Sequence, residues 1–568
     1  MSYLWNLPQK IDPTIFDKFP ELHPIVAQLL YHRGLTTQEK IDEFLYPDYS
    51  QDIHDPCLFK DMDKACDRIF QAIDQQELIT IFGDYDADGV SAAVILWSIL
   101  KNLGAKVDVY LPHREKEGYG LNKNAIKELA QKQTKLLITC DCGISNAEEV
   151  DLANSQKIDV IITDHHSIPE EVPKVLAIIH PQMKDEKYPF KFLSGGGVAF
   201  KLTQALIKHS GNKISDPEKE IQEKWLLDMV AISTVADMVP LLGENRTLLK
   251  YGLIVLKKTQ RLGLRKMIEV ASIDFNKIDA RAISFGLAPR INAAGRMDHA
   301  NLAFYLLTEE NEDKALKLAT ELNQSNLERQ RLTEQIFNQA QKLDIDLKES
   351  LLIFYQSDWP AGLTGLVASR LARKYSRPCL VVTDSSDGLV GSGRSIENFN
   401  ITDALEKNNQ LLIKFGGHPQ ACGFSLVKEN FEKLSISMKE IANQQLKDIV
   451  FQKKLNIEIM IDFEEINWEI VDILEKFKPF GKDNPEPLFM SKDVAITSAR
   501  KVGRDGSHWK LELIKGSKKR GAIGFGLSNI NLEIGHQVDL VYNLSINEWN
   551  GNREIQLIIK DIKHHDKG

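Results

Sequence analysis

The sequence predicts an α/β protein in which two α/β domains, joined by a long helix, precede a C-terminal β-barrel. From residue 78, short runs of apolar and β-branched residues alternate with helical patterns, as in a parallel α/β fold. Residues 311–343 form a helical stretch without Pro or Gly. From residue 455, short strands of alternating polarity follow, and these indicate a small barrel or sandwich.

The first domain is preceded by an irregular segment. Residues 1–50 are punctuated by Pro, so we expect an N-terminal arm or a wing on the first domain. The continuous apolar runs that follow are typical of strands buried on both faces of a parallel sheet; they cover residues 78–84, 106–112, 135–141, 159–166 and 175–181. Because 568 residues are too many for one core, we predict an arm (1–50), a first α/β domain (51–310), a connector helix (311–345), a second α/β domain (346–450) and a β-rich domain (455–568).

Composition excludes several classes of protein. No stretch approaches the roughly 20 apolar residues of a membrane span, and the N-terminus lacks the features of a secretion signal. Six cysteines without framework spacing fit a reducing compartment, so we expect a cytoplasmic protein without membrane contact. The net charge of −9 does not favour a nucleic-acid coat protein, but it allows an enzyme with a local basic groove.

Acidic residues and histidines follow several of the predicted strands. Because ligands bind at the carboxyl ends of parallel strands, we expect these side chains to meet at one sheet edge. Such a cluster is unfavourable without cations, and carboxylates with imidazoles suit Mn²⁺ or Mg²⁺ better than structural Zn²⁺. A carboxylate shared by two ions is the usual two-metal geometry, so we predict two ions. The residues are Asp84, Asp86, Asp88, Asp141, Asp164, His165, His166 and Asp237.

The motifs around these residues resemble those of the DHH phosphoesterase superfamily. Later motifs resemble its DHH-associated domain, and the whole of residues 50–560 is similar to the RecJ family of single-strand-specific exonucleases. The resemblance implies a DHH domain at 51–310, a DHH-associated domain at 346–450 and an OB-like domain at 455–568. The motifs are, in chain order, "DYDADG", "DCG", "DHH", "ADMVP", "APRINAAGRM", "GSGRS" and "GGHPQACGF".

The resemblance also implies roles for single residues. His166 takes the place of the histidine that contacts the phosphate, and Asp164 and His166 are the expected catalytic residues. No side-chain nucleophile is required. The expected metal ligands are Asp84, Asp86, Asp88, Asp141, His165 and Asp237.

Cations near the acids are candidate substrate-binding groups. Guanidinium groups bind phosphate in a fork, so Arg290 and Arg394, one from each α/β domain, are expected to meet and to recognise a terminal 5′-phosphate. Surface or interdomain ion pairs are the alternative for each arginine, and a buried structural role is the alternative for His418. The candidates are Arg114, Arg290, Arg296, Ser392, Arg394 and His418.

The β-rich domain carries a basic segment. Residues 500–520 contain eight Lys or Arg against two acids, with Trp509 among them. Basic groups around an aromatic platform bind single strands without sequence preference. A solvated hairpin with a core tryptophan is the alternative.

The resemblance implies metal-dependent 5′-to-3′ hydrolysis of single-stranded DNA to mononucleotides, in DNA repair and recombination. Expected partners are single-stranded DNA, a single-strand-binding protein and a helicase, with a monomeric enzyme. One alternative is a DHH phosphodiesterase of short oligonucleotides or cyclic dinucleotides. The other is a non-catalytic DNA-binding scaffold for replication, which should have lost several of the acids.

Overall fold

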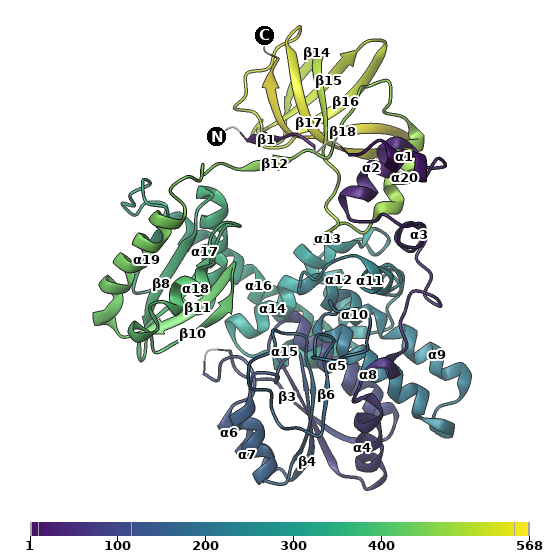
Figure 1. Cartoon of the computed structure of the whole chain (residues 1–568), viewed down its shortest axis with the longest axis vertical. Helices are drawn as coiled ribbons and strands as arrows, with labels where there is room; N and C mark the ends of the chain where they lie inside the picture. The colour runs from purple at the N-terminus through teal and green to yellow at the C-terminus, as the bar shows by residue number, and fades with distance from the viewer. Residues whose placement is uncertain (1–2, 9–10, 115, 550, 566–568) are drawn as a thin grey trace. The chain divides into compact units, whose positions relative to one another are not determined.

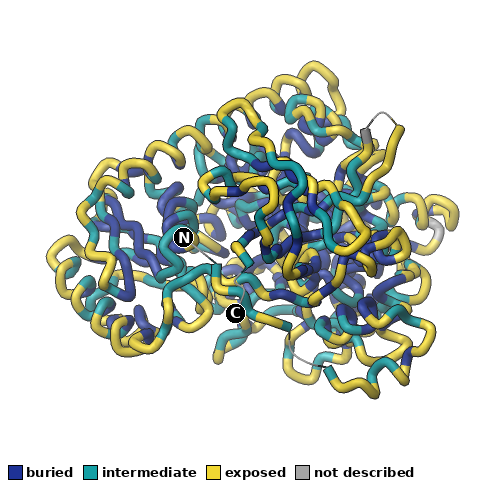
Figure 2. Tube along the Cα trace, turned by 90° about the horizontal axis from the view of Figure 1, so that it is seen from above, coloured by how far each residue is buried: buried dark blue, intermediate teal, exposed yellow. Residues whose placement is uncertain are grey.

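The computed structural model describes residues 3–8, 11–114, 116–549 and 551–565. The chain divides into two compact units. Unit 1 contains residues 1–52, 240–246 and 452–568, and unit 2 contains residues 53–239 and 247–451. Buried segments, dark blue in Figure 2, run along the inner strands and helices, whereas exposed segments are yellow turns and outer helices.

Unit 2 begins with a parallel sheet in the order β3-β2-β4-β5-β6. Helices cover both of its faces, because alternate strand residues point in opposite directions: Leu137 packs with α6 and α7, whereas Cys140 reaches the Gly89 carbonyl of α5. The predicted parallel sheet with helices on both faces is therefore confirmed (Figure 1). The elements are α4 (Met62–Asp74), β2 (Leu78–Gly83), α5 (Ala87–Asn102), β3 (Lys106–Tyr110), α6 (Lys123–Gln131), β4 (Thr134–Cys140), α7 (Ala147–Ser155), β5 (Asp159–Thr163), β6 (Ala177–Ile179) and α8 (Gly195–His209).

A helical layer continues unit 2 and ends in the predicted long helix, α16 (Glu312–Ala340). Asn311 caps its N-terminus by accepting a hydrogen bond from the Lys314 amide. The preceding elements are α9 (Asp216–Trp225), α10 (Leu227–Ala236), α11 (Gly243–Leu256), α12 (Leu262–Val270), the π-helix Ile283–Leu287, α14 (Ala288–Met297) and α15 (Asn301–Thr308).

The second sheet of unit 2 is mixed, in the order β10-β11-β9-β8-β7. Only β7 and β8 pair in parallel among its described strands. Val367 and Leu371 of α17 pack on one face, and Leu434 and Met438 of α19 pack on the other. The elements are β7 (Leu352–Tyr355), α17 (Thr364–Tyr375), β8 (Cys379–Ser385), β9 (Gly388–Arg394), α18 (Ile401–Glu406), β10 (Lys414–His418), β11 (Ala421–Leu426) and α19 (Phe431–Gln445).

Unit 1 contains a closed β-barrel. Its strands follow the order β14-β15-β16-β18-β17, and pairing of β14 with β17 closes the cylinder, so the predicted barrel is confirmed (Figure 1). Closure removes the open sheet edges. The elements are β13 (Ile459–Met460), α20 (Trp468–Phe477), β14 (Phe489–Val502), β15 (His508–Lys515), β16 (Lys518–Gly524), β17 (Gln537–Trp549) and β18 (Asn552–His564).

The N-terminal segment belongs to unit 1 and is not a wing on the first α/β domain. Its helices α2 (Pro24–His32) and α3 (Gln38–Leu45) contribute Leu30 and Phe44 to the barrel core, beside Phe477. Its strand β1 (Leu4–Asn6) pairs with β12 (Lys454–Asn456). The buried guanidinium of Arg246 also donates to the carbonyls of Phe44 and Phe477, which holds residues 240–246 in the same unit.

Candidate active site

Acidic side chains meet at the carboxyl edge of the parallel sheet, as predicted. Asp84 follows β2, and Asp141 follows the neighbouring β4. Asp237 caps the C-terminus of α10. Within the described part of the chain, the possible ligand atoms converge to within 4.8 Å in overlapping groups: Asp84, Asp86 and Asp141; Asp88, His165 and Asp237; Asp141, His165 and His166. We call Asp84, Asp86, Asp88, Asp141, His165 and Asp237 the acidic centre.

The local backbone geometry orients these side chains toward one another. The Asp86 carboxylate caps α5 by accepting from the amides of Asp88 (2.8 Å) and Gly89 (3.1 Å). A Cβ at Gly89 would lie 2.6 Å from the Asp84 backbone, so this tight turn requires glycine. Asp141 adopts the left-handed region with φ of 63°, a conformation that surrounding contacts must maintain.

The N-terminus of α8 holds Asp88. The amides of Gly195 and Gly196 donate to its two carboxylate oxygens at 2.8 Å each, and the Ser233 hydroxyl donates to one of them. A Cβ at Gly195 would lie 2.6 Å from Asp141, so this close approach requires glycine. Sequence reasoning missed this support, although the run "SGGG" before a helix was its signal.

The electrostatics of the acidic centre indicate a bound cation. Burial and neighbouring carboxylates raise the pKa of Asp84 and Asp141 well above the usual range, and they raise the pKa of Asp237 to about 9. One oxygen of Asp84 is buried without a hydrogen-bond partner among the described residues. Burial and the nearby His166 lower the pKa of His165 to about 4, which favours the neutral imidazole that a metal ion requires. Its Nε2 lies 3.0 Å from an Asp141 oxygen. Converging oxygens and one imidazole fit Mn²⁺ or Mg²⁺.

Asp164 orients the ring of His166. Asp164 is fully buried. One oxygen accepts from the Ile144 amide, and the other accepts from the amide and Nδ1 of His166. Although burial opposes it, hydrogen bonding to His166 lowers the pKa of Asp164 to about 2. Although burial also opposes it, the hydrogen bond to the Asp164 carboxylate raises the pKa of His166 to about 9. Both oxygens of Asp164 thus bond to the protein, and the catalytic role predicted for Asp164 stays a prediction.

Three predicted arginines gather near the acidic centre. Arg114 stacks its guanidinium 4.9 Å from the ring centre of Tyr85. Burial and nearby Arg114 lower the pKa of Arg296 to about 9, and both also lower the pKa of Arg394. Arg296 and Arg394 donate to the carbonyls of Gly362 and Gly393. In the described part of the chain, none of the three has a carboxylate within ion-pair distance, so the ion-pair alternative does not hold for them.

Arg290 lies elsewhere. It donates to Asn323 and to the Gly286 carbonyl. Arg290 and Arg296 lie six positions apart on α14, which corresponds to a rotation of about 240° around the helix. Their side chains therefore extend from the helix in different directions. The expected meeting of Arg290 and Arg394 is therefore replaced by one of Arg296 and Arg394.

Ser392 and His418 come from the second sheet. The Ser392 hydroxyl lies 2.9 Å from that of Thr364 at the start of α17, and the Arg394 side chain lies 3.2 Å from the Cβ position of Gly365. His418 is exposed and its ring is stacked 6.4 Å from that of His166. The predicted facing of His418 toward the first domain is thus observed, and the buried alternative is not.

Comparisons with known proteins agree with this site. Family models match the DHH family N-terminal domain at residues 78–234, the DHHA1 domain at 348–444 and the RecJ OB domain at 457–561. The single-stranded-DNA-specific exonuclease RecJ of Escherichia coli is 32% identical over 98% of this chain and 98% of its own. The chain belongs to the RecJ family.

Other RecJ proteins are similar over most of the chain. The Bacillus subtilis RecJ is 37% identical over 98% of this chain and 70% of its own. The crystal structure of RecJ in complex with Mn²⁺ from Thermus thermophilus matches with a TM-score of 0.84 and 27% identity, over 99% of this chain and 80% of that one. A second structure of that RecJ, in complex with Mg²⁺, has a TM-score of 0.78 at 26% identity and covers 99% and 79%.

The structure also contradicts the prediction for Trp509 in this RecJ-family chain. Its side chain is 8% exposed within the barrel core, and its Nε1 donates to the Ile530 carbonyl. The core alternative is therefore correct, because the indole sits on an inward-facing position of β15. The exposed aromatic nearby is Phe525, 56% exposed and 5.3 Å edge-on from His508.

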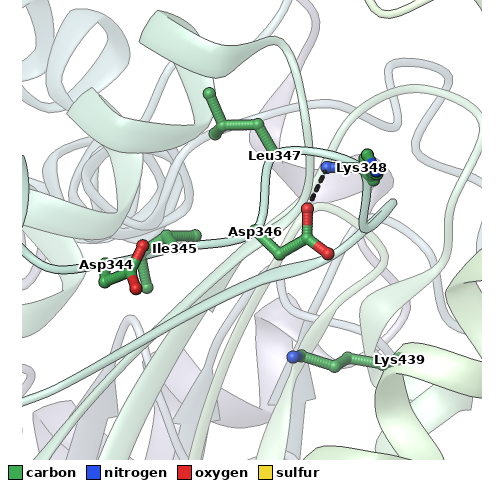
Figure 3. A pocket seen from close by; sticks show the side chains of 6 residues that line it. All are labelled: Asp344, Ile345, Asp346, Leu347, Lys348 and Lys439. Atoms are coloured by element: carbon green, nitrogen blue, oxygen red, sulfur yellow. Dashed lines mark hydrogen bonds between the residues drawn. The ribbon is translucent and has the colours of Figure 1, made fainter.

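A hollow on the surface of unit 2 is unrelated to the site. It has a volume of about 760 Å³ and is lined by residues 344–348 and Lys439 (Figure 3). None of these residues belongs to the acidic centre or to the arginines described above.

Among the described helices, none is both long and apolar enough to cross a bilayer.

Proposed function

We propose that this RecJ-family chain hydrolyses single-stranded DNA from its 5′ end to mononucleotides, with Mn²⁺ or Mg²⁺ as the cofactor. The observation that carries the proposal is the convergence of buried carboxylates and a neutral imidazole at one sheet edge. The membership in the RecJ family supports single-stranded DNA as the substrate.

The acidic centre offers ligands for two ions. Asp84, Asp86 and Asp141 would hold one ion, and Asp88, His165 and Asp237 would hold the other; Asp141, in contact with His165, is suited to be shared. Bound divalent cations lower the pKa of an attacking water and neutralise charge that develops on the phosphate.

His166 acts on the phosphate. Because its pKa is raised to about 9, the ring is cationic at neutral pH. Its Nδ1 is bonded to Asp164, so Nε2–H remains to donate to a phosphate oxygen as negative charge develops. Asp164 keeps the ring in this orientation.

Arg114, Arg296 and Arg394 form a pocket for the terminal 5′-phosphate, with Ser392 beside them. Like charges gathered without carboxylate partners favour an anion, just as the gathered carboxylates favour a cation. A terminal phosphate carries about −1.5 to −2 charge, by analogy with phosphorylated side chains, and offers oxygens to a guanidinium fork.

The barrel of unit 1 binds the strand away from its end. Phe525 and His508 form the stacking platform, and Lys501 and Arg504 contact phosphates. Phe525→Ala should weaken binding of a long strand by about 5–150-fold, since stacking contributes ~1–3 kcal/mol per base. Trp509→Ala should instead lower the melting temperature of the barrel.

The other candidate functions are less well supported. A phosphodiesterase of short oligonucleotides or cyclic dinucleotides would not require the OB domain at residues 457–561. A non-catalytic scaffold would not require the complete acidic centre. We place the enzyme in DNA repair and recombination in the cytoplasm, as a monomer with a single-strand-binding protein and a helicase as partners.

The test is digestion of 5′-labelled and 3′-labelled single strands, of duplex and of dinucleotides with Mn²⁺ or Mg²⁺. Labelled mononucleotide should appear first from 5′-labelled single strands. Release of the 3′ label first would contradict the polarity, and faster turnover of dinucleotides than of long strands would favour the short-substrate alternative.

A further inference from the structure

Tyr119 joins two parts of the site that sequence reasoning treated separately. It lies in the loop after β3, between Gly118 and Gly120, whose φ angles are 82° and 80°. Its hydroxyl lies 3.2 Å from the carbonyl oxygen of Asp141 and 3.0 Å from Nδ1 of His166. One hydroxyl thus contacts both a residue of the acidic centre and the histidine that acts on the phosphate.

The donors and acceptors leave one consistent arrangement. The Asp141 carbonyl can only accept, so the phenol donates its proton there. The phenol oxygen then accepts from Nδ1–H of His166, which lies 2.9 Å from Asp164 as well. Tyr119 and Asp164 therefore both place a proton on Nδ1, and Nε2 is the nitrogen that faces substrate.

The Asp141 backbone requires such support. With a φ of 63°, this residue adopts a conformation that only its surroundings maintain. Its amide donates to the Thr163 carbonyl at 3.0 Å, and its carbonyl accepts from Tyr119. These two hydrogen bonds fix the backbone of Asp141, and the backbone in turn sets the direction of the carboxylate.

The loop that carries Tyr119 is itself fixed. The side chain of Asn146 accepts from the Leu121 amide and donates to the Leu121 carbonyl, at 3.2 Å each. A Cβ at Gly120 would lie 2.6 Å from the same side chain. The Tyr119 ring also packs edge-on against His166 at 5.3 Å. Its hydroxyl is therefore placed by the loop and does not depend on substrate.

We propose that Tyr119 is a positioning residue that holds the Asp141 carboxylate and the His166 ring in a fixed relation to each other. The phosphate must meet both groups at once, and the shared hydroxyl prevents either from turning alone. The inference rests on the role proposed above for His166. It assigns Tyr119 no contact with DNA.

Tyr119→Phe removes only the hydroxyl. Because the residue is 40% exposed and keeps its ring, we expect an unchanged melting temperature. At saturating Mn²⁺, kcat should fall about 10–100-fold, the range for partners that orient functional groups, while KM for a long strand stays within about twofold. The Mn²⁺ concentration at half-maximal rate should rise, because the Asp141 backbone loses one of its two bonds. Tyr355→Phe is the matched control, since its hydroxyl donates to Asp384 in the second sheet, and its kcat should be unchanged.

A double-mutant cycle with His166→Ala separates positioning from general support. In the His166→Ala background at saturating Mn²⁺, Tyr119→Phe should lower kcat less than about threefold, because the ring that Tyr119 positions is absent. A full additional loss there, or a wild-type kcat for Tyr119→Phe alone, would overturn the inference. A wild-type kcat for His166→Ala would reject the proposed role of His166 and this inference with it. A loss confined to KM would mean that Tyr119 contacts the strand instead.

Discussion

The acidic centre of unit 2 and the basic face of the unit 1 barrel both serve phosphate chemistry, but they are built in opposite ways. Asp88 and Asp141 are buried and held by backbone bonds, and their charges repel in a region of low dielectric. The basic face is exposed, and its side chains have no ion-pair partner in the described part of the chain. By the basic face we mean the exposed basic side chains at the end of β14, in the turn after it and along β15 and β16, namely Arg500, Lys501, Arg504, Lys510, Lys518 and Lys519.

This difference determines how each region responds to change. The acidic centre depends on a few short distances, so one substitution removes a ligand that no neighbour can replace. The basic face acts through many weak contacts that salt screens, so single changes have graded effects. A single substitution in the acidic centre should therefore abolish most of the activity, whereas substitutions on the basic face should each weaken binding a little and add up.

The largest effect is expected for loss of a metal ligand. Asp141→Ala or Asp237→Ala should lower the rate of single-strand cleavage at saturating Mn²⁺ by more than about 10³-fold, since metal stabilisation of the transition state amounts to several kcal/mol. Asp159→Ala is the control, because Asp159 begins β5 at the opposite end from the site and pairs with Arg68. Near-normal turnover in either test variant would reject the two-metal site.

The next effect concerns the 5′ end. Arg394→Ala should slow cleavage of 5′-phosphorylated strands about 10²-fold and of 5′-hydroxyl strands only a few-fold, because the fork binds the terminal oxygens. Lys at this position should restore part of the rate, since an ammonium lacks the planar fork. Arg370→Ala is a control in the same sheet domain, where Arg370 pairs with Glu334. Equal losses on both strands would mean that Arg394 holds the backbone and does not recognise the end.

The same comparison shows what the sequence could and could not predict. Most acids of the centre were identified because they follow buried strands, and parallel strands bring their carboxyl ends to one edge; Asp237 instead follows a helix. Trp509 was misplaced because a basic segment with one aromatic residue has the same appearance whether the ring faces inward or outward. A register shift of one residue exchanges the two faces of a strand, and only the barrel decides which face is buried.

Other parts of the structure depend on contacts distant in sequence. The pairing of residues 1–52 with the barrel could not be predicted, because β1 and β12 lie about 450 positions apart. Tyr119 had no chemical signal of its own, since its role comes from a hydroxyl that meets the Asp141 carbonyl and His166. The first sheet, by contrast, was predictable from local patterns alone.

A smaller, graded effect is expected on the basic face. Deleting the barrel would also expose the core that it shares with residues 1–52, so substitution is the sharper test. The triple variant Lys501→Ala, Arg504→Ala and Lys510→Ala should reduce the slope of log affinity against log salt by about 0.7 for each phosphate that the protein no longer neutralises. The control removes three ion-paired lysines, Lys123, Lys208 and Lys213, with the same change in charge. An equal slope in both triple variants would show that the basic face does not bind the strand.

The smallest effect concerns the stability of the metal-free protein. The sign of the change in melting temperature distinguishes a carboxylate that is repelled by other carboxylates from one that is bonded to a cation. The pKa of Asp237 is raised to about 9 by burial and by Asp88 and Asp86, whereas that of an unfolded Asp is about 3.9. The folded carboxyl thus holds its proton more tightly, so metal-free stability is greatest below pH 4 for this group and is lost as pH rises toward 9.

Asp237→Asn removes this penalty. In EDTA at pH 8, it should raise the melting temperature by about 1 °C, corresponding to ~1 kcal/mol in a unit of this size, and the gain should shrink at pH 5. Asp228→Asn is the matched control on the same helix, because Asp228 is buried but bonded to Arg261 and Thr259, and it should lower the melting temperature. Added Mn²⁺ should stabilise the unsubstituted protein and reverse the advantage of Asp237→Asn, since the ion then binds the carboxylate that burial disfavours. A fall in metal-free melting temperature for Asp237→Asn at pH 8 would show that these carboxylates do not repel one another.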